Sequence, residues 1–351
     1  MSIIDKPTDH FETKLYTGTG SSLANSSLNF QPDFTWIKGR SGATEHVLTD
    51  SVRGVTKELS SNDSGAEETV AQGLTAFGSN GFTVGTDGSY NTSSATYSSW
   101  NWKAGTAFTN DASATGIGTI DSTGSVNTDA GFSIMSYTGN GSAGANFAHG
   151  LEVKPACVIV KRRNASSNWQ FVSKALSATP FGSGNYLKLN STDGMGTNTA
   201  VWNTEPTSSL IYLQANSDTN ASGGTYVCYA FAEKQGYSKF GSYTGNGSTD
   251  GTFVYTGFKP AFFLVKKSSA GGNWWSMFDN KRLASFNPVD ARLFPNVANA
   301  ESTSDSLDFV SNGVKFRATD TDYNGSGATY IYMSFAENPF VTSTGVPATA
   351  R

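Results

Sequence analysis

Ser136-Tyr137-Thr138-Gly139-Asn140-Gly141-Ser142 recurs unchanged as Ser242-Tyr243-Thr244-Gly245-Asn246-Gly247-Ser248, and Tyr16-Thr17-Gly18-Thr19-Gly20-Ser21 is a weaker copy. Tyr and Thr favour a strand, and Asn-Gly supplies the positive φ angles of a primed hairpin turn. Each copy is therefore expected to be the end of a strand that runs into a tight turn. A recurrence at a spacing of about 100 residues predicts a repeat architecture.

A proline and a short apolar run that ends in basic residues follow each copy of the turn. The three cases are Pro32 with residues 33–37, Pro155 with residues 156–160, and Pro260 with residues 261–265. Proline can begin a strand but rarely occupies its middle. A continuous apolar run is typical of a strand buried on both faces. We therefore expect one such central strand in each repeat.

Further landmarks keep the same order along the chain. A Leu-x-x-Asn pattern occurs at residues 59–62, 187–190 and 293–296. Phe-Ala-Glu closes the second and third repeats at 231–233 and 335–337, whereas Trp100 and Trp102 close the first. Each unit has room for roughly seven short strands. The sequence thus predicts an all-β fold of three tandem antiparallel β-sandwich repeats, jelly-roll-like and about 100 residues each.

The segments between these landmarks suggest where the repeats begin and end. Residues 106–129 are rich in Gly, Ser, Thr and Asp, which is typical of a linker. Only residues 66–72 resemble a helix. The expected division is an N-terminal arm (1–10), repeat 1 (11–105), a linker (106–130), repeat 2 (131–236), repeat 3 (237–341) and a C-terminal tail (342–351).

The composition limits the classes of partner. Charged residues make up 15% of the 351 residues, below the roughly 25% of ordinary soluble domains, and the formal charge is −4. Nucleic-acid binding needs clustered Lys and Arg, so we expect no nucleic-acid partner. No apolar run approaches the roughly 18 residues of a membrane span, so we expect no membrane insertion. Residues 1–7 lack the apolar segment of a secretory signal, which predicts synthesis in a cytoplasm without standard export.

The two cysteines are expected to be free and buried. Cys157 and Cys228 lie in strand-like runs, and two cysteines do not make a disulfide framework. Aligning the repeats places Phe34 and Phe262 at the position of Cys157, and Tyr332 at that of Cys228. Positions that accept bulky aromatic residues are typical of packing sites. Neither thiol has a His or basic cluster nearby in sequence, so we expect no catalytic thiol.

The residues that usually carry catalysis form no recognisable motif. His10, His46 and His149 occupy different points of the repeat and have no Ser, Cys or carboxylate at a motif spacing. No phosphate-binding loop of the pattern G-x-x-x-x-G-K-[ST] occurs. Glu233 and Glu337 recur at the ends of two repeats, but the first repeat has alanine there. We therefore predict a protein that is not an enzyme, with no catalytic residue and no cofactor.

One segment matches the beginning of a calcium-binding loop. Residues 320–325 read Asp-Thr-Asp-Tyr-Asn-Gly, which fits the pattern D-x-D-x-N-G. The bidentate Glu of such a loop is missing, because Ile331 stands at its twelfth position. We therefore expect an Asp- and Asn-rich turn between strands and no metal site.

Five motifs together resemble a known family. They are Tyr-Thr-Gly-Asn-Gly-Ser (243–248), Lys-Pro-Ala (259–261), Asn-Trp-Trp (273–275), Asp-Ser-Val-Arg-Gly (50–54) and Trp-Asn-Trp-Lys-Ala-Gly (100–105). Over most of its length the chain resembles the uncharacterised tandem-repeat proteins of tailed-phage virions, tail fibre or surface proteins that are common in marine phages. The resemblance implies a location in the virion after synthesis in the host cytoplasm. It concerns a repeated fold and implies no catalytic residues.

Three functions of different classes are compatible with these observations. The first is a structural tail protein, such as a fibre, that contributes to attachment to glycans of the host surface. The second is a capsid decoration protein, which needs only a docking surface on the shell. The third is a glycan-degrading tailspike, which requires two carboxylates facing one cleft about 5 to 10 Å apart. We favour the first, because the sequence singles out no such pair.

Two kinds of partner follow from the strands and the aromatic residues. Uncharged strand edges with few Lys residues are weakly protected against pairing, so we expect a homo-oligomer, for example a trimer, besides contacts with other virion proteins. Sugar recognition usually needs an exposed ring with polar groups at its edge. The candidate contacts for a glycan or another partner are Trp169, Trp274, Trp275, Tyr137 and Tyr243. The alternative is that these rings fill the sandwich cores; of the adjacent Trp274 and Trp275, one should be buried and the other exposed.

Overall fold

The computed structural model describes residues 4–282, 287–304 and 306–347. In this part of the chain the strands form six antiparallel sheets, which confirms the predicted all-β fold. The helices there are short, namely the 3-10 helix η1 (Pro7–Asp9), α1 (Gly88–Asn91), α2 (Ala112–Thr115) and α3 (Ser217–Asn220). None of the described helices is long and apolar enough to cross a membrane. Residues 1–3 of the expected arm and 348–351 of the expected tail lie outside the described residues.

The three large sheets follow one another along the chain. In order across the sheet, the first contains β1 (Phe11–Thr17), β9 (Thr96–Trp102), β3 (Phe34–Gly39), β4 (His46–Asp50), β5 (Lys57–Ser60) and β6 (Glu68–Thr69). The second contains β10 (Thr106–Asn110), β11 (Ser122–Asn127), β12 (Phe132–Thr138), β19 (Thr225–Phe231), β14 (Cys157–Arg162), β15 (Gln170–Ser173), β16 (Asn185–Lys188) and β17 (Gly196–Thr197). The third contains β20 (Ser238–Thr244), β26 (Thr329–Pro339), β22 (Phe258–Lys267) and β23 (Ser276–Asp279).

A small sheet accompanies each large one. The small sheets contain β2 (Leu23–Asn25), β8 (Gly81–Val84) and β7 (Leu74–Gly78) in repeat 1, β13 (Asn146–Ala148) and β18 (Leu210–Tyr212) in repeat 2, and β21 (Phe253–Tyr255), β25 (Gly313–Phe316) and β24 (Leu307–Val310) in repeat 3. Within repeat 1, Leu74 and Val84 of the small sheet share a buried cluster with Ile37 of the large sheet. The two sheets of a repeat therefore enclose a core, as in a sandwich.

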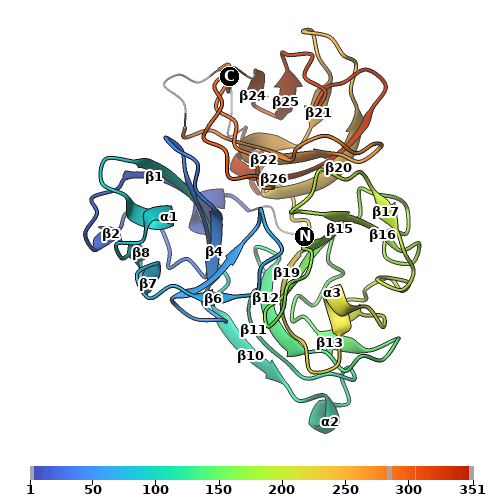
Figure 1. Cartoon of the computed structure of the whole chain (residues 1–351). Helices are drawn as coiled ribbons and strands as arrows, with labels where there is room; N and C mark the ends of the chain where they lie inside the picture. The colour runs from blue at the N-terminus through green and yellow to red at the C-terminus, as the bar shows by residue number, and fades with distance from the viewer. Residues whose placement is uncertain (1–3, 283–286, 305, 348–351) are drawn as a thin grey trace.

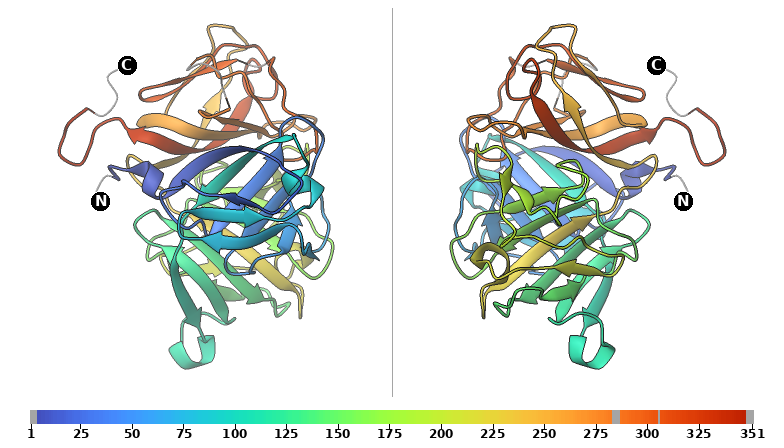
Figure 2. Two further views of the ribbon diagram at one scale, coloured as in Figure 1. Left: turned by 90° about the vertical axis from the view of Figure 1, so that its left-hand side faces the viewer. Right: turned by 90° about the vertical axis from the view of Figure 1, so that its right-hand side faces the viewer.

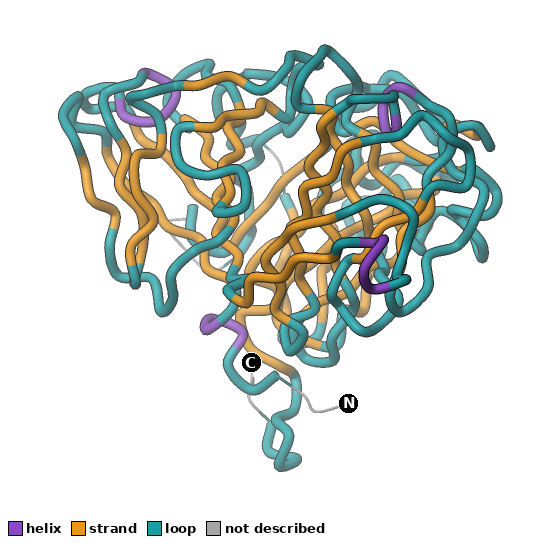
Figure 3. The backbone as a smooth tube through the Cα atoms, turned by 90° about the horizontal axis from the view of Figure 1, so that it is seen from below, coloured by secondary structure: helices purple, strands orange, loops and turns teal. Residues whose placement is uncertain are grey.

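The repeats are arranged around a common centre. Figure 1 shows three lobes, with repeat 1 in blue and cyan, repeat 2 in green and yellow, and repeat 3 in orange and red. The side views in Figure 2 show η1 and the segment that follows β26 on the same side of the body, where the N–H of Ser343 donates to Asp5 Oδ1. Figure 3 shows strands and the loops between them throughout this body, with the short helices at its periphery. The three lobes thus meet at one buried cluster to which each contributes residues.

The central strands β3, β14 and β22 explain how the lobes are joined. On β14, Val158 and Val160 face the core of repeat 2, whereas Cys157 and Ile159 belong to a cluster that all three repeats share. We call this the shared cluster; other strands contribute to it Phe34 and Trp36 of β3, and Phe262 and Leu264 of β22. Alternate side chains of a strand point to opposite faces. The continuous apolar runs are therefore buried on both faces, as predicted, and both cysteines are free and buried.

Three closing aromatic residues meet in the shared cluster. The ring centroids of Trp102, Phe231 and Phe335 lie 6.4 Å (Trp102–Phe231), 5.6 Å (Trp102–Phe335) and 5.8 Å (Phe231–Phe335) apart. They come from β9, β19 and β26, the equivalent strands of the three repeats. Burial of a large apolar side chain stabilises a fold by roughly 1.5–3 kcal/mol. Each repeat therefore depends on the other two for burial of its inner face.

The repeated turn is held by a tyrosine and a buried asparagine. In repeat 2 the Tyr137 hydroxyl donates to the Thr219 carbonyl at 2.7 Å, and Asn220 Oδ1 accepts the N–H of Asn140 at 2.9 Å. In repeat 3 the Tyr243 hydroxyl donates to the Tyr323 carbonyl, and Asn324 Oδ1 accepts the N–H of Asn246. In repeat 1 the Tyr16 hydroxyl donates to the Tyr90 carbonyl, and Asn91 Oδ1 accepts the N–H of Thr19. A Cβ on Gly139 would lie 2.5 Å from the Ala221 carbonyl, so this position requires glycine. The recurring motif therefore serves the fold.

The turn is not the primed hairpin that the sequence predicts. Gly141 (φ +75°) and Gly247 (φ +64°) are left-handed, but Asn140 and Asn246 are not. A primed turn of type I′ needs positive φ at both central residues. The turn joins β12 to β13 and β20 to β21, which lie in different sheets, so it links the two layers of a sandwich.

Two further expectations about local structure are wrong. The expected linker, 106–130, contains β10 and β11, which extend the second large sheet beyond β12. Its backbone is ordered by hydrogen bonds to an existing sheet edge, which needs little apolar content. The helix-like segment 66–72 contains β6, paired with β5. Here strand pairing overrides a weak local helix propensity.

Candidate functional site

Two of the predicted contact residues lie inside the molecule. Trp169 and Trp275 are buried, and each indole Nε1 donates to a backbone carbonyl of the neighbouring repeat. The Trp169 bond reaches Ser60 at 2.8 Å, and the Trp275 bond reaches Lys188 at 3.0 Å. Both rings therefore connect repeats and have no face free for a ligand, which corrects the prediction for these two residues.

The two tyrosines before the repeated turn pack between other aromatic rings, Tyr137 as a buried residue and Tyr243 as a half-buried one. Tyr137 stacks between Phe147 and Tyr226, with ring centroids 4.2 and 5.0 Å away. Tyr243 lies in the same way between Phe316 and Tyr330, both at 5.1 Å. Their hydroxyls are used in the turn. Tyr137 therefore has no face free for a glycan, which corrects the prediction for this residue. Tyr243 is half-buried, and the contact predicted for it stays a prediction.

Trp274 differs from the other candidates because it reaches the surface. Its side chain is 39% exposed, whereas Trp275 is 1% exposed, as expected for these neighbours. The Trp274 ring meets Phe294 edge to face at 5.1 Å, and its backbone N–H donates to Asp322 Oδ1 at 3.0 Å. Asn273 Nδ2 donates to the same oxygen at 2.9 Å. Trp274 is thus an exposed ring that packs on Phe294, and its backbone is fixed by a hydrogen-bonded Asn273–Asp322 pair.

The calcium-like segment binds a guanidinium. Asp320 Oδ2 lies 3.2 Å from Arg292 Nη1, and Asp322 Oδ2 contacts Arg292 Nη2. The Arg292 guanidinium also lies over the Phe294 ring, 4.6 Å from its centroid. Among the described residues, no group of three or more His, Cys, Asp or Glu side chains is placed to hold a metal ion. Asp320 and Asp322 therefore hold Arg292 over Phe294, the ring on which Trp274 packs.

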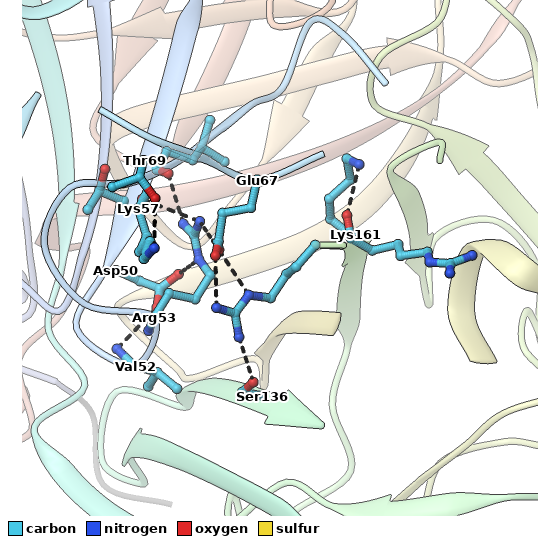
Figure 4. Close-up of polar contacts among 12 residues, drawn as sticks. Asp50, Val52, Arg53, Lys57, Glu67, Thr69, Ser136 and Lys161 are labelled. Carbon is cyan, nitrogen blue, oxygen red and sulfur yellow. Dashed lines mark hydrogen bonds and ion pairs between the residues drawn. The ribbon is translucent and has the colours of Figure 1, made fainter. Parts of the chain in front are cut away.

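A buried ion network joins repeats 1 and 2 (Figure 4). Asp50 Oδ2 accepts from Arg53 Nε at 2.5 Å and from the Tyr229 hydroxyl at 2.7 Å. Glu67 lies 3.2 Å from Arg53 Nη1 and accepts two bonds from Arg163, both at 2.9 Å. Asp50, Arg53 and Glu67 come from repeat 1, whereas Tyr229 and Arg163 come from repeat 2. The network therefore fastens one repeat to the next.

The same network recurs between repeats 3 and 1. Asp279 Oδ2 accepts from Arg282 Nε at 2.6 Å and from Trp100 Nε1 at 2.9 Å. Glu301 accepts from Arg282 at 2.9 Å and from Arg40 at 2.8 and 3.0 Å. The recurring spacing Asp-x-x-Arg, at 50–53 and 279–282, is the signal by which the sequence could have revealed these groups.

Among the described residues, the third interface, between repeats 2 and 3, lacks the buried Asp–Arg pair of the other two. Ser173 and Leu176 of repeat 2 stand where repeats 1 and 3 have the Asp and the Arg of the network. A backbone bond nevertheless recurs at all three interfaces, from Glu67 to Arg163 (2.7 Å), Glu301 to Arg40 (3.0 Å) and Met195 to Ser268 (2.9 Å). At this third interface Glu233 of repeat 2 instead forms an ion pair with Lys239 of repeat 3, at 2.9 Å. The three interfaces therefore share the backbone bond and differ in their charged residues.

The histidines are engaged in the fold. Burial lowers the pKa of His149 to about 4, and burial followed by the nearby Lys38 and Arg282 lowers the pKa of His46 well below its usual value. His149 Nδ1 accepts the N–H of Leu151 at 3.2 Å. Burial, as the largest cause, also lowers the pKa of His10. A general base works best with a pKa near the working pH and within reach of a proton to remove, and His46 and His149 do not meet these conditions.

One surface pocket is lined by two carboxylates. Glu12 and Glu337 border a pocket of about 220 Å³ between repeats 1 and 3. Burial is the largest effect on the pKa of Glu12 and raises it, while its Oε2 accepts the N–H of Asn29 at 2.8 Å. Glu337 Oε2 lies 2.8 Å from Lys259 Nζ. Both carboxylates thus already have partners within the chain.

The comparisons with known proteins identify a family. A family model described as Domain of unknown function (DUF7483) matches residues 6–339, so the chain belongs to this family. No curated protein and no solved structure matches the chain.

Proposed function

We propose that this chain, a member of the DUF7483 family, is a non-enzymatic structural protein of a tailed-phage virion that contributes to attachment to host-surface glycans. The proposal starts from the use of its polar groups. The carboxylates and guanidiniums of two interfaces hold the repeats together, and His46 and His149 are buried. A tail fibre or tail-associated position remains our favoured location.

The exposed Trp274 is the observation that supports glycan contact. All seven tryptophans of the chain lie in the described residues, and the other six are buried. Sugar rings have apolar faces that pack on an aromatic ring, and their hydroxyls bond to polar groups at its edge. Asn273 and Asp322 lie beside Trp274, where they bond to each other and to the Trp274 backbone and so fix the position of this residue. Trp274 therefore supplies the exposed ring that glycan contact requires.

Substitution of Trp274 tests the attachment proposal. We expect Trp274→Ala to weaken binding of the purified protein to host cells by roughly tenfold, because an aromatic contact contributes about 0.5–1.5 kcal/mol beyond its buried area. Ile117→Ala, which also truncates an exposed apolar side chain, is the matched control and should bind normally. Unchanged binding of a folded Trp274→Ala variant would contradict the proposal.

The location in the particle separates the tail from the capsid alternative. Electron microscopy of virions labelled with antibody against the protein should show label at the tail. Label spread over the shell would favour capsid decoration. The glycan-degrading alternative has Glu12 and Glu337 in its favour, but their existing partners make them a weaker basis than Trp274.

A further inference from the structure

Strand β21 carries two exposed aromatic rings on the small sheet of repeat 3. Phe253 is 45% exposed and Tyr255 is 59% exposed, whereas Val254 between them is buried in the sandwich core. Alternation along the strand therefore places both rings on the outer face of the sheet. β21 stands at the end of the sheet order β21-β25-β24, so the rings lie at an open edge.

Glycines let these rings lie close to the backbone. Gly313 is directly opposite Tyr255 in the register, so its missing side chain would share the outer face. A Cβ on Gly313 would come within 2.9 Å of the Phe253 ring. A Cβ on Gly257 would lie 3.5 Å from the Tyr255 hydroxyl, which is an ordinary contact, so the close packing depends on Gly313. The Phe253 ring thus covers the glycine backbone with one side, which leaves its other side turned to solvent.

Paired charges surround the rings. Lys315 lies opposite Phe253, and Asp308 lies opposite Lys315, so all three occupy the outer face. Lys315 Nζ is 2.7 Å from Asp250, and Arg317 Nε is 2.6 Å from Asp308. The rim offers hydrogen-bond donors and acceptors whose charges cancel. Such a surface suits an uncharged, hydroxyl-rich ligand and offers no net attraction to nucleic acid or an anionic membrane.

The fold does not require these rings. β13 of repeat 2 takes the equivalent place after the repeated turn and has Asn146 and Ala148 on either side of the buried Phe147. Repeat 2 thus forms the equivalent sandwich core without outward-facing aromatic residues on this strand. The two rings of repeat 3 therefore call for an explanation other than stability of the sandwich.

We propose that Phe253 and Tyr255 form a glycan-stacking platform for a neutral oligosaccharide, separate from Trp274. This proposal rests on the proposed function in glycan attachment and assigns it a specific surface. Two adjacent outward residues of one strand lie roughly 6.6 Å apart, so the platform presents its rings side by side along one oligosaccharide. The charged pairs at the rim bind its hydroxyl groups.

Binding to immobilised neutral oligosaccharides of hexose and N-acetylhexosamine units tests the platform. We expect the double variant Phe253→Ser/Tyr255→Ser to bind roughly tenfold more weakly than the unaltered chain. Trp274→Ala should retain measurable binding to the platform. The variants Phe253→Tyr and Tyr255→Phe keep a ring at each position and should bind almost normally, which separates ring loss from general damage. Thermal unfolding of each variant checks that it is folded.

The outcomes separate this inference from the proposed function. Normal binding by the folded double variant, with loss of binding in Trp274→Ala, would overturn the platform and leave the proposed function standing. Absence of binding to neutral oligosaccharides by the unaltered chain, with binding to host cells intact, would also overturn the platform alone. A double variant that loses self-association but not glycan binding would show that a second copy of the chain occupies this surface, contrary to the proposal.

Discussion

Arg53 is held by groups from both sides of the interface between repeats 1 and 2. Its guanidinium bonds to Asp50, to the Leu48 carbonyl at 2.8 Å and to the Tyr229 hydroxyl at 3.2 Å. Asp50 and Arg53 are buried. Two opposite charges taken out of water are stable only while both are present, so each residue of this network depends on its partners.

Removal of one buried charge is therefore expected to be costly. We expect Arg53→Met to lower the free energy of unfolding by about 3–5 kcal/mol, because Asp50 would remain buried without its partner. Lys154→Met is the control, since its ion pair with Glu205 is largely exposed and should contribute less than about 1 kcal/mol. Urea unfolding of both variants measures the difference. An Arg53→Met variant as stable as Lys154→Met would show that the network contributes little.

At the scale of the elements, the repeated sequence pattern predicts the central strands, whereas single segments and residues predict little of the remaining structure. The apolar runs predict β3, β14 and β22, because burial on both faces leaves a direct mark on composition. Strands β10 and β11 could not be predicted, since their order comes from pairing with β12. The buried partners of Trp169 and Trp275 were also hidden, because both acceptors are backbone carbonyls. Only the exposure of one residue of the Trp274–Trp275 pair followed from the sequence.

The central strands share one further feature, a buried lysine near the end of each. Lys38, Lys161 and Lys266 are buried, and burial is the main cause that lowers the pKa of each to about 8. Lys161 Nζ donates across the interface to the Ser64 carbonyl at 3.2 Å, and Lys266 Nζ reaches the Thr192 carbonyl at 3.2 Å. These amines thus help to join the repeats through neutral acceptors.

The lowered pKa values of these lysines predict that the stability of the protein changes with pH in the alkaline range. Lysine in an unfolded chain titrates near its ordinary pKa of 10.5, so between about pH 8 and 10.5 the unfolded state holds more protons than the folded one. The free energy of unfolding should therefore rise with pH in this window. In the Lys161→Met variant the free energy of unfolding should rise less with pH than in the unaltered chain, whereas in Lys154→Met the rise should be unchanged. Urea unfolding at about pH 8 and about pH 10 compares them, and equal slopes in Lys161→Met and the unaltered chain would refute the assignment.

At the scale of the whole molecule, the chain places three sandwiches around one core. The shared cluster takes residues from all three large sheets, and two ion networks with three backbone contacts close the ring. A repeat separated from the others would expose the inner face of its large sheet to water. The predicted homo-oligomer stays a prediction, and its contacts would have to form outside this ring. Partners can contact the loops and the small sheets, and Trp274 lies in such a loop and β21 in such a sheet.

Calorimetric unfolding of the full chain tests most directly whether the shared cluster makes the repeats one unit. We expect a single transition whose calorimetric enthalpy equals its van't Hoff enthalpy, because no repeat can bury its inner face alone. Phe231→Ala, which truncates one of the three central rings, should shift this whole transition to lower temperature. Separate transitions for the repeats, with Phe231→Ala lowering only one of them, would contradict the account.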